Sequence, residues 1–380
     1  MKALHIITGL GAGGAEQQLR LLVRHLPGNH EVLTLTDPGQ VAAGLRRDGV
    51  RVAHLGMAGN RDVRALPRLV RFIRDGRYNL VHTHLYRACL YGRIAARLAG
   101  VRAVVATEHS LGDGQIEGRA LTPGVRGLYL AGERLGRATI AVSPAVAERL
   151  HRWGVERHRV HVVPNGVDVP RFAFDAAARA AARRELGLAD GAFVIGGVGR
   201  LVAGKRFDVL IDALRELPGD VRLLLVGTGP EEPSLRRAAC RAGVQDRLVL
   251  AGERPHTATG PSGTVTDLPA LMSAMDVLAS PSTDEAFGLA VVEAQAAGLP
   301  VLHVNCPALD DLPAGIGAHA VQVPCAPGAF VREATALRVA PAGPRKPSQA
   351  AVHYSIARSA ALHHEVYATV LGAPTSAPQE

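Results

Sequence analysis

Aromatic residues and cysteines are scarce in this sequence. Phe, Trp and Tyr make up 4% of its 380 residues, and the four cysteines form no C-x-x-C pair. We therefore expect reduced thiols and no cysteine-based metal site. The few aromatics also leave no stacking platform for nucleic acid, and no known nucleic-acid motif is present. Nucleic-acid binding is therefore not predicted.

Long apolar runs are missing as well. No window of about 18 uncharged apolar residues occurs, which predicts that no helix spans a membrane. The apolar run within Met1–Leu10 is interrupted by His5 and is too short for the hydrophobic region of a secretory signal. We therefore expect a cytoplasmic protein that at most touches the inner face of a membrane.

Charge is present but unevenly distributed, with a net value of +9. Residues 1–168 contain 24 Lys and Arg against 13 Asp and Glu, whereas residues 169–380 contain 19 against 21. The halves thus carry +11 and −2, and such an asymmetry favours different partners for the two halves. The first half is expected to attract an anionic partner, with an ordinary solvated arginine surface as the alternative.

Short apolar runs alternate with amphipathic stretches along the chain, a pattern typical of buried parallel strands joined by helices. Strands are expected near residues 3–8, 31–36, 51–55, 80–84, 103–108, 139–142 and 160–163, and again near 193–197, 222–226, 247–250, 277–280, 301–304 and 320–323. The sequence therefore predicts an α/β protein with two doubly wound, Rossmann-like domains, residues 1–168 and 169–350. A closing helix over 351–372 and a disordered tail over 373–380 are expected to follow.

A glycine-rich string, Gly9 to Gly14, follows the first expected strand. Glycines let the backbone approach a phosphate, and the amides at the start of the next helix favour negative charge. The string also fits G-x-G-x-x-G, and Asp37 ends the next strand, as in dinucleotide-binding enzymes. An NAD- or FAD-dependent oxidoreductase therefore stays open as an alternative, as does a purely structural turn.

A second string, Gly199 to Arg206, follows the first strand of the second half. It contains Arg200 and Lys205, and two cations five residues apart on a glycine-bearing turn can straddle a diphosphate. Arg206 stands where a P-loop needs Ser or Thr after its lysine, so the string is not a P-loop.

A third string contains Glu285 and Glu293. Glu285 precedes a helix expected to start near Gly288, and Glu293 lies two turns into that helix. The amides of Phe287, Gly288 and Leu289 are expected to face a phosphate. Glu293 has apolar neighbours in sequence, so an ionised carboxylate there needs a partner. The two acids are suited to accept hydrogen bonds from a sugar and a ribose.

With Gly-Gly-Ala-Glu at Gly13–Glu16 and the string Val163–Asp168, these motifs resemble glycosyltransferase family 4 over nearly the whole chain. The most specific pieces are Gly199–Lys205 and the E-x7-E pair within Glu285–Pro300. The resemblance implies a GT-B fold, with two domains facing a central cleft and the C-terminal helix crossing back to the first domain. It also implies retaining transfer of a hexose-type sugar from a UDP- or GDP-linked donor to a hydroxyl acceptor, without a metal or other cofactor.

The resemblance implies roles for residues of the second half. Arg200 and Lys205 would neutralise the donor diphosphate. Glu285 would hold hydroxyls of the donor sugar, and Glu293 would hold the ribose. Because no convincing D-x-D motif ends a strand, these cations and the backbone amides would do the work of a metal.

In the first half, the resemblance implies that Gly13 and Gly14 approach the donor phosphate and that His109 contacts the donor sugar beside the reacting carbon. His82 and His84 end a strand and share one of its faces, so we expect them to grip an acceptor. A metal site there is not expected, because no third ligand is evident from the sequence.

Two features of the sequence leave the substrates open. After Pro300 the chain lacks the Gly-Gly-x-x-Glu string that the family often has, and the excursion Arg254–Thr266 could shape donor choice. Five arginines at helical spacing within Arg64–Arg77 suggest a lipid-linked acceptor or contact with an anionic membrane. A nucleotide-sugar epimerase of the same fold is a further alternative.

Overall fold

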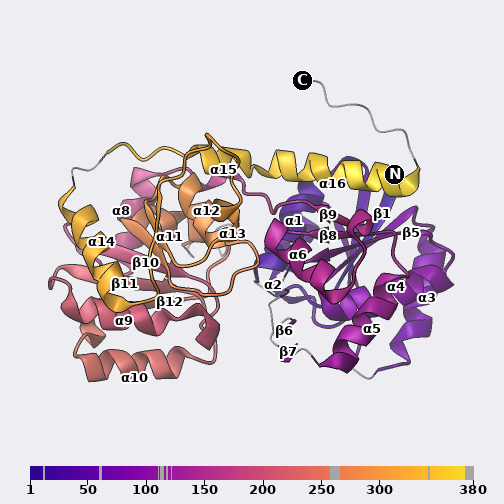
Figure 1. Ribbon diagram of the computed structural model, residues 1–380, viewed down its shortest axis with the longest axis horizontal. Helices are drawn as coiled ribbons and strands as arrows, with labels where there is room; N and C mark the ends of the chain where they lie inside the picture. Colours follow the sequence, from indigo (N-terminus) through magenta and orange to yellow (C-terminus); the bar gives the residue numbers. More distant parts are fainter. Residues whose placement is uncertain are drawn as a thin grey trace. The chain divides into compact units, whose positions relative to one another are not determined.

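The computed structural model describes residues 1–11, 13–59, 62–109, 111, 115–116, 119–120, 122–256, 266–340 and 343–372. The chain forms two compact units, one of Met1–Gly166 with Ile356–Glu380 and the other of Val167–Ser355 (Figure 1). The predicted tail and most of the expected excursion after Arg254 lie outside the described residues.

The first unit is built on a seven-stranded parallel sheet with the order β3-β2-β1-β4-β5-β8-β9. Its strands are β1 Lys2–Ile7, β2 Asn29–Thr34, β3 Arg51–His54, β4 Leu80–His84, β5 Ala103–Glu108, β8 Ala138–Ala141 and β9 Val160–Val162. Its α-helices are α1 Gly14–His25, α2 Gly39–Arg47, α3 Ala65–Gly76, α4 Tyr86–Leu98, α5 Pro123–Glu133, α6 Pro144–Trp153 and α16 Ile356–Leu371. A short antiparallel ribbon, β6 Gln115–Ile116 with β7 Arg119–Ala120, lies outside this sheet. Because the strand order reverses between β1 and β4, ligands are expected at the carboxyl ends of these two strands.

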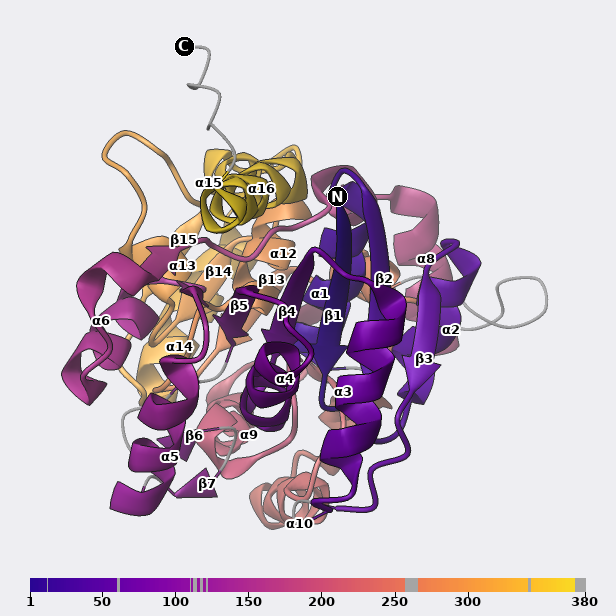
Figure 2. The same cartoon turned by 90° about the vertical axis from the view of Figure 1, so that its right-hand side faces the viewer.

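Side chains of β1 alternate between the two faces of this sheet. Leu4 and Ile6 pack with residues of α3 and α4, and Figure 2 shows these two helices in front of β1 and β4. Ala3 packs on the opposite face with residues of α1 and α16, including Tyr367. By the same alternation His5 lies on the face that α16 covers, and this positions the histidines described below.

The second unit repeats the design with a six-stranded parallel sheet, in the order β12-β11-β10-β13-β14-β15. Its strands are β10 Phe193–Val198, β11 Val221–Val226, β12 Leu248–Gly252, β13 Val277–Ser280, β14 Val301–His303 and β15 Ala320–Gln322. Its α-helices are α7 Val169–Phe172, α8 Ala176–Glu185, α9 Phe207–Glu216, α10 Glu232–Ala242, α11 Leu268–Ala274, α12 Leu289–Ala296, α13 Pro307–Asp310, α14 Pro327–Val339 and α15 Gln349–His353. Here the order reverses between β10 and β13. The predicted pair of doubly wound units is confirmed.

The closing helix differs from the prediction. Instead of one helix over 351–372, the chain forms α15 in the second unit and α16 in the first. The break has a physical cause, because the Tyr354 carbonyl accepts a hydrogen bond from the Val167 amide at 2.8 Å and Ser355 forms a parallel bridge with Val167. The two stretches of chain that connect the units therefore run side by side.

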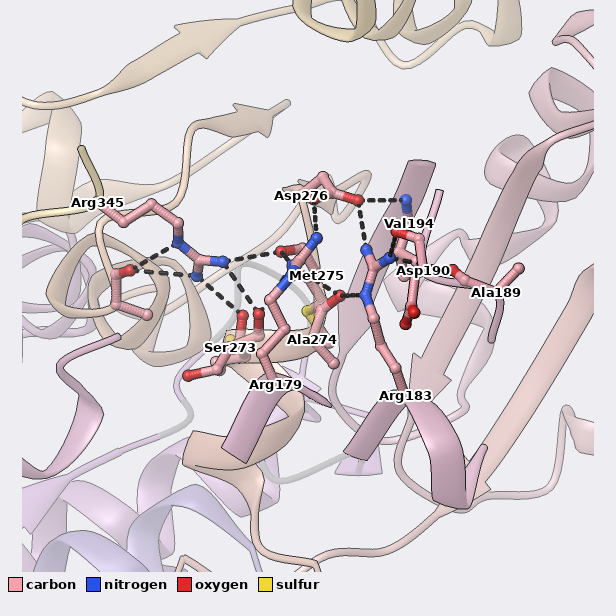
Figure 3. A network of polar contacts seen from close by, with 12 residues as sticks. Arg179, Arg183, Ala189, Asp190, Val194, Ser273, Ala274, Met275, Asp276 and Arg345 are labelled. Atoms are coloured by element: carbon pink, nitrogen blue, oxygen red, sulfur yellow. Dashed lines mark hydrogen bonds and ion pairs between the residues drawn. The ribbon is translucent and has the colours of Figure 1, made fainter. Parts of the chain in front are cut away.

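Three arginines form hydrogen bonds with the segment that precedes β13 in the second unit (Figure 3). Arg179 and Arg183, both on α8, bind the two carboxylate oxygens of Asp276 at 2.7 and 2.8 Å. Arg345 donates to the main-chain carbonyls of Met272, Ser273, Met275 and Ala297. The stretch around Arg345 is thus anchored where α11 ends and β13 begins.

Membrane-spanning helices were also sought in the described part of the chain. None of its helices is both long and apolar enough to cross a bilayer.

Candidate active site

The turn after β10 is shaped by close contacts between main chains. Gly199 has a φ of +148° and Gly227, after β11, has a φ of +139°. A side chain on Gly227 would collide with the Gly199 carbonyl, and one on Gly229 would collide with the Leu201 main chain. The Leu201 amide also donates to the Thr228 carbonyl at 2.9 Å. Glycines are therefore required here to bring the ends of β10 and β11 together.

This turn carries the two predicted cations. The Lys205 ammonium forms an ion pair with the Glu285 carboxylate, whose side chain follows β13, so the structure brings these two predicted residues together. Arg200 is exposed, and within the described residues its guanidinium has no hydrogen-bond or ion-pair partner. The turn after β10 thus presents two cations, of which Lys205 is paired with Glu285 and Arg200 is exposed, and cations of this kind can bind an anionic group.

The start of α12 lies beside Glu285 in the sequence. Gly288 caps the helix with a φ of +97°, makes no side-chain cap, and leaves no room for a Cβ beside the Cys306 thiol. Phe287 is buried, and its carbonyl accepts from the Ala308 amide at 2.9 Å. The first amides of a helix have no acceptor within it, so those of Gly288 and Leu289 belong to an uncapped, electropositive helix start.

Glu293 has the partner that its apolar surroundings require. The residue is 4% exposed, and its Oε1 atom lies 2.9 Å from Nε2 of His256. The His256 ring packs edge-on against Phe172, and its Nδ1 is buried without a hydrogen-bond partner among the described residues. The sequence did not single out His256, which follows β12 at the start of the excursion that was expected to shape donor choice.

In the first unit, the predicted glycine loop leads into α1. Gly13 is the N-cap of α1, and a Cβ there would lie 2.5 Å from the Glu16 carboxylate, so the Glu16 side chain would have to move to admit a larger residue. Gly14 is the first residue of the helix. Asp37 accepts the Gly39 amide at 2.9 Å with its side chain. The acid expected to bind a ribose in a dinucleotide enzyme is thus used in a local turn.

The histidines of β4 are interior residues. His82 and His84 are 0% and 1% exposed. The His82 ring nitrogens bind the Tyr367 hydroxyl and the Thr107 hydroxyl, each at 2.7 Å. The sequence correctly placed both rings on one strand face, but α16 covers that face. The prediction that His82 and His84 contact an acceptor therefore needs correction, because both side chains are buried and both already form hydrogen bonds inside the first unit.

His84 connects to two further histidines. Its Nε2 lies 3.2 Å from His5 Nδ1, and its Nδ1 lies 3.2 Å from His109 Nε2. Burial lowers the pKa of His5, His82 and His84 well below the usual value, and lowers the pKa of His109 to about 3. These rings are therefore neutral near pH 7.

A third histidine, His5, lies beside His82 and His84, and the sequence did not reveal that it would. Ring nitrogens of His5, His82 and His84 lie within 4.8 Å of one another, a spacing that suits a metal ion. However, both nitrogens of each ring already have a hydrogen-bond partner. Metal binding would have to break these bonds, so we assign the cluster to hydrogen bonding.

Both units match known families. Residues 12–171 match the model described as Glycosyltransferase Family 4, and residues 192–338 match the model described as Glycosyl transferases group 1. A crystal structure of Anabaena HepE with UDP and glucose has a TM-score of 0.82 at 21% identity, covering 97% of this chain and all of the other. The fold is therefore GT-B, and each of the two parts of the chain matches a glycosyltransferase model, the Family 4 model in the first part and the group 1 model in the second.

Curated relatives cover a smaller part. A D-inositol 3-phosphate glycosyltransferase of Xylanimonas cellulosilytica is 35% identical over 246 residues, which is 60% of this chain and 56% of the relative. The UDP-Gal:alpha-D-GlcNAc-diphosphoundecaprenol alpha-1,3-galactosyltransferase of Escherichia coli is 29% identical over 252 residues, 64% of this chain and 62% of the relative. The chain thus spans somewhat more than half the length of these relatives.

Proposed function

We propose that this chain is a glycosyltransferase that moves a hexose-type sugar from a UDP- or GDP-linked donor to a hydroxyl acceptor, with retention and without a bound metal. The observation that carries the proposal is the pairing of Lys205 with Glu285 at the point where the second sheet reverses its strand order. The same turn carries Arg200, which is exposed and has no ion-pair partner among the described residues. Nucleotides bind at such reversal points in open α/β sheets.

The charges fit the chemistry of donor cleavage. Breaking the bond between the sugar and the diphosphate leaves a growing negative charge on the leaving group. Arg200, Lys205 and the amides at the start of α12 are preorganised to stabilise it, as a metal would otherwise do. When a donor binds, Lys205 can turn to the phosphate and leave the Glu285 carboxylate to accept hydrogen bonds from sugar hydroxyls. The retaining outcome rests on the resemblance to the family.

The comparisons support a nucleotide sugar in general terms. The Escherichia coli relative is named for a UDP-Gal donor, and the Anabaena structure contains UDP with glucose. Glu293 is placed to hold a ribose in this proposal, with His256 orienting its carboxylate.

A thermal-shift screen tests the donor. A cognate nucleotide sugar at about 100 times its dissociation constant should stabilise the fold that binds it by roughly 2.7 kcal/mol. We expect UDP or GDP and one of their sugars to raise the melting temperature without added metal, in the presence of EDTA. A shift with NAD or FAD alone would favour the oxidoreductase, and donor consumption without any acceptor would favour an epimerase.

For the acceptor, we propose a lipid-linked hydroxyl compound presented at an anionic membrane surface. Helix α3 buries Ala65, Leu69 and Ile73, while the arginines within Arg64–Arg77 are all exposed. Beside α3 lies a cavity of about 420 Å³, lined in part by Arg74, Arg77, Arg102, Val370 and Leu371. Cations around a partly apolar cavity suit an anionic lipid headgroup.

Vesicle binding tests this acceptor side. Replacing Arg64, Arg71 and Arg74 by Ser should weaken sedimentation with vesicles that contain phosphatidylglycerol, because about 1 kcal/mol of attraction is lost per cation near the surface. The matched control replaces Arg236, Arg237 and Arg241, exposed on α10, and removes the same charge. Equal losses in both variants, or no binding by the unmodified protein, would contradict a specific membrane contact.

A further inference from the structure

A row of four histidines crosses the first sheet. His30 on β2, His5 on β1, His84 on β4 and His109, directly after β5, come from four strands that are neighbours in the sheet order. The ring contacts are His30 Nδ1 to His5 Nε2 at 3.0 Å, His5 Nδ1 to His84 Nε2 at 3.2 Å, and His84 Nδ1 to His109 Nε2 at 3.2 Å. At its far end, His30 Nε2 lies 3.2 Å from the Pro27 carbonyl oxygen.

The carbonyl at one end fixes the protons of the whole row. A carbonyl oxygen can only accept, so His30 must carry its proton on Nε2. A neutral ring has one donor and one acceptor, so His30 Nδ1 accepts and His5 must donate from Nε2. The same step repeats at His84 and at His109. All four rings are therefore Nε2-protonated, and His109 Nδ1 is left as a bare acceptor.

Neutrality of the rings, which this deduction needs, follows from burial. Burial lowers the pKa of all four histidines. A charge on one ring would also repel a charge on its neighbour, since His30 lowers the pKa of His5, and His5 and His109 lower that of His84. Since every hydrogen bond in the row points toward Pro27, each bond polarises the next and strengthens the acceptor at His109.

The free end of the row has no partner of its own. His109 Nδ1 is buried, and within the described residues no group donates to it. A buried acceptor without a donor costs free energy, which a ligand hydroxyl in its place would recover. A sugar offers such a hydroxyl.

We propose that the His30–His5–His84 row holds His109 as an obligate hydrogen-bond acceptor, so that His109 Nδ1 selects a hydroxyl of the donor sugar. His5, His30 and His84 are positioning residues that act through His109. The role of His109 toward the sugar rests on the proposed function, whereas the proton arrangement of the row does not.

Nitrogen NMR of 15N-histidine-labelled protein tests the arrangement without any substrate. Long-range proton–nitrogen spectra at pH 7 should show His5, His30, His84 and His109 protonated at Nε2 only. His363 serves as the internal contrast, because its Nδ1 lies 2.8 Å from the Ser359 carbonyl and must carry the proton. An Nδ1 proton or a doubly protonated ring within the row would overturn the proposal, as would one equivalent of tightly bound zinc.

A pair of variants at His5 separates a positioning role from a structural one. In His5→Asn the amide oxygen can still accept from His84, whereas His5→Leu removes that acceptor. We expect mixed protonation of His84 and His109 in His5→Leu and an unchanged pattern in His5→Asn, with each spectrum assigned at a temperature where both variants are folded. Loss of one hydrogen bond should lower kcat/KM for the donor about tenfold in His5→Leu, with rescue in His5→Asn.

Failure of the proposed function can be distinguished from failure of the inference about the histidine row. If no nucleotide sugar is cleaved by the unmodified protein, the proposed function fails while the NMR pattern still decides the proton arrangement. If the donor is cleaved and both His5 variants keep the original kcat/KM and pattern at His109, the row does not position His109 and the inference fails.

Discussion

Replacement of Glu285 by Ala is expected to lower kcat/KM for donor cleavage by about 100-fold or more. The carboxylate would lose hydrogen bonds to sugar hydroxyls, and each such charged bond contributes about 1.5–3 kcal/mol. The measurement is release of the nucleoside diphosphate from the donor that the thermal-shift screen identifies. The fold should survive, because Glu285 lies in the loop between β13 and α12 and the Lys205 side chain, 27% exposed, can turn its charge to solvent.

A neighbouring cation provides the control for this experiment. Arg206 follows Lys205 directly but pairs with Asp208 in an exposed position. Arg206→Ala should keep kcat/KM near its original value, whereas Lys205→Ala should lower it, because only Lys205 faces Glu285. Full activity in Glu285→Ala would refute the assignment of this acid to the donor sugar.

Acidification from pH 7.0 to 5.5 is expected to lower the free energy of unfolding of the first unit. Burial holds the pKa of His5, His82 and His84 well below 6.5, that of His109 at about 3 and that of His363 at about 4. Below pH 6.5 these histidines bind protons in the unfolded chain but stay unprotonated in the folded unit. The stability contribution is therefore present above this pH and is lost as pH falls, by roughly 1 kcal/mol per histidine over this interval.

Guanidinium unfolding followed by fluorescence measures this loss. The chain has a single tryptophan, Trp153, which is buried in the first unit and reports its unfolding. A His82→Gln variant should lose one histidine's share of the pH dependence, because the buried ring that resists protonation is removed. Equal unfolding free energies at both pH values would mean that the buried rings already carry charge.

Much of the architecture could be predicted, because it is encoded in local patterns. Parallel strands buried on both faces appear as apolar runs, and the glycines of the turn after β10 appear beside the cations that they position. The pairing of Lys205 with Glu285 follows from strand order, since both residues come after strands that meet at the reversal of the sheet.

The missed features depend on contacts between distant parts of the sequence. Strand alternation placed His82 and His84 together, but only the return of Tyr367, 285 residues after His82, buries that face. His5 lies within an apolar strand, and only the fold brings it next to His84. His256 lies within a polar loop, and only the fold brings it next to Glu293. The break before α16 depends on the main chain of Val167, which local helix propensity does not include.

Because α16 packs in the first unit, this unit is a discontinuous domain, built from two separate ranges of the sequence. A fragment ending at Gly166 would lack Tyr367 and expose one face of the sheet, with its histidines, to water. A Cβ placed on Gly166 would lie only 2.5 Å from the Cα atom of Ile356, so the two pieces of this unit approach each other where the second unit is inserted. Deleting residues 167–355 and joining Gly166 to Ile356 would therefore give a smaller protein than the full chain that still keeps the complete core of the first unit, unlike the fragment that ends at Gly166.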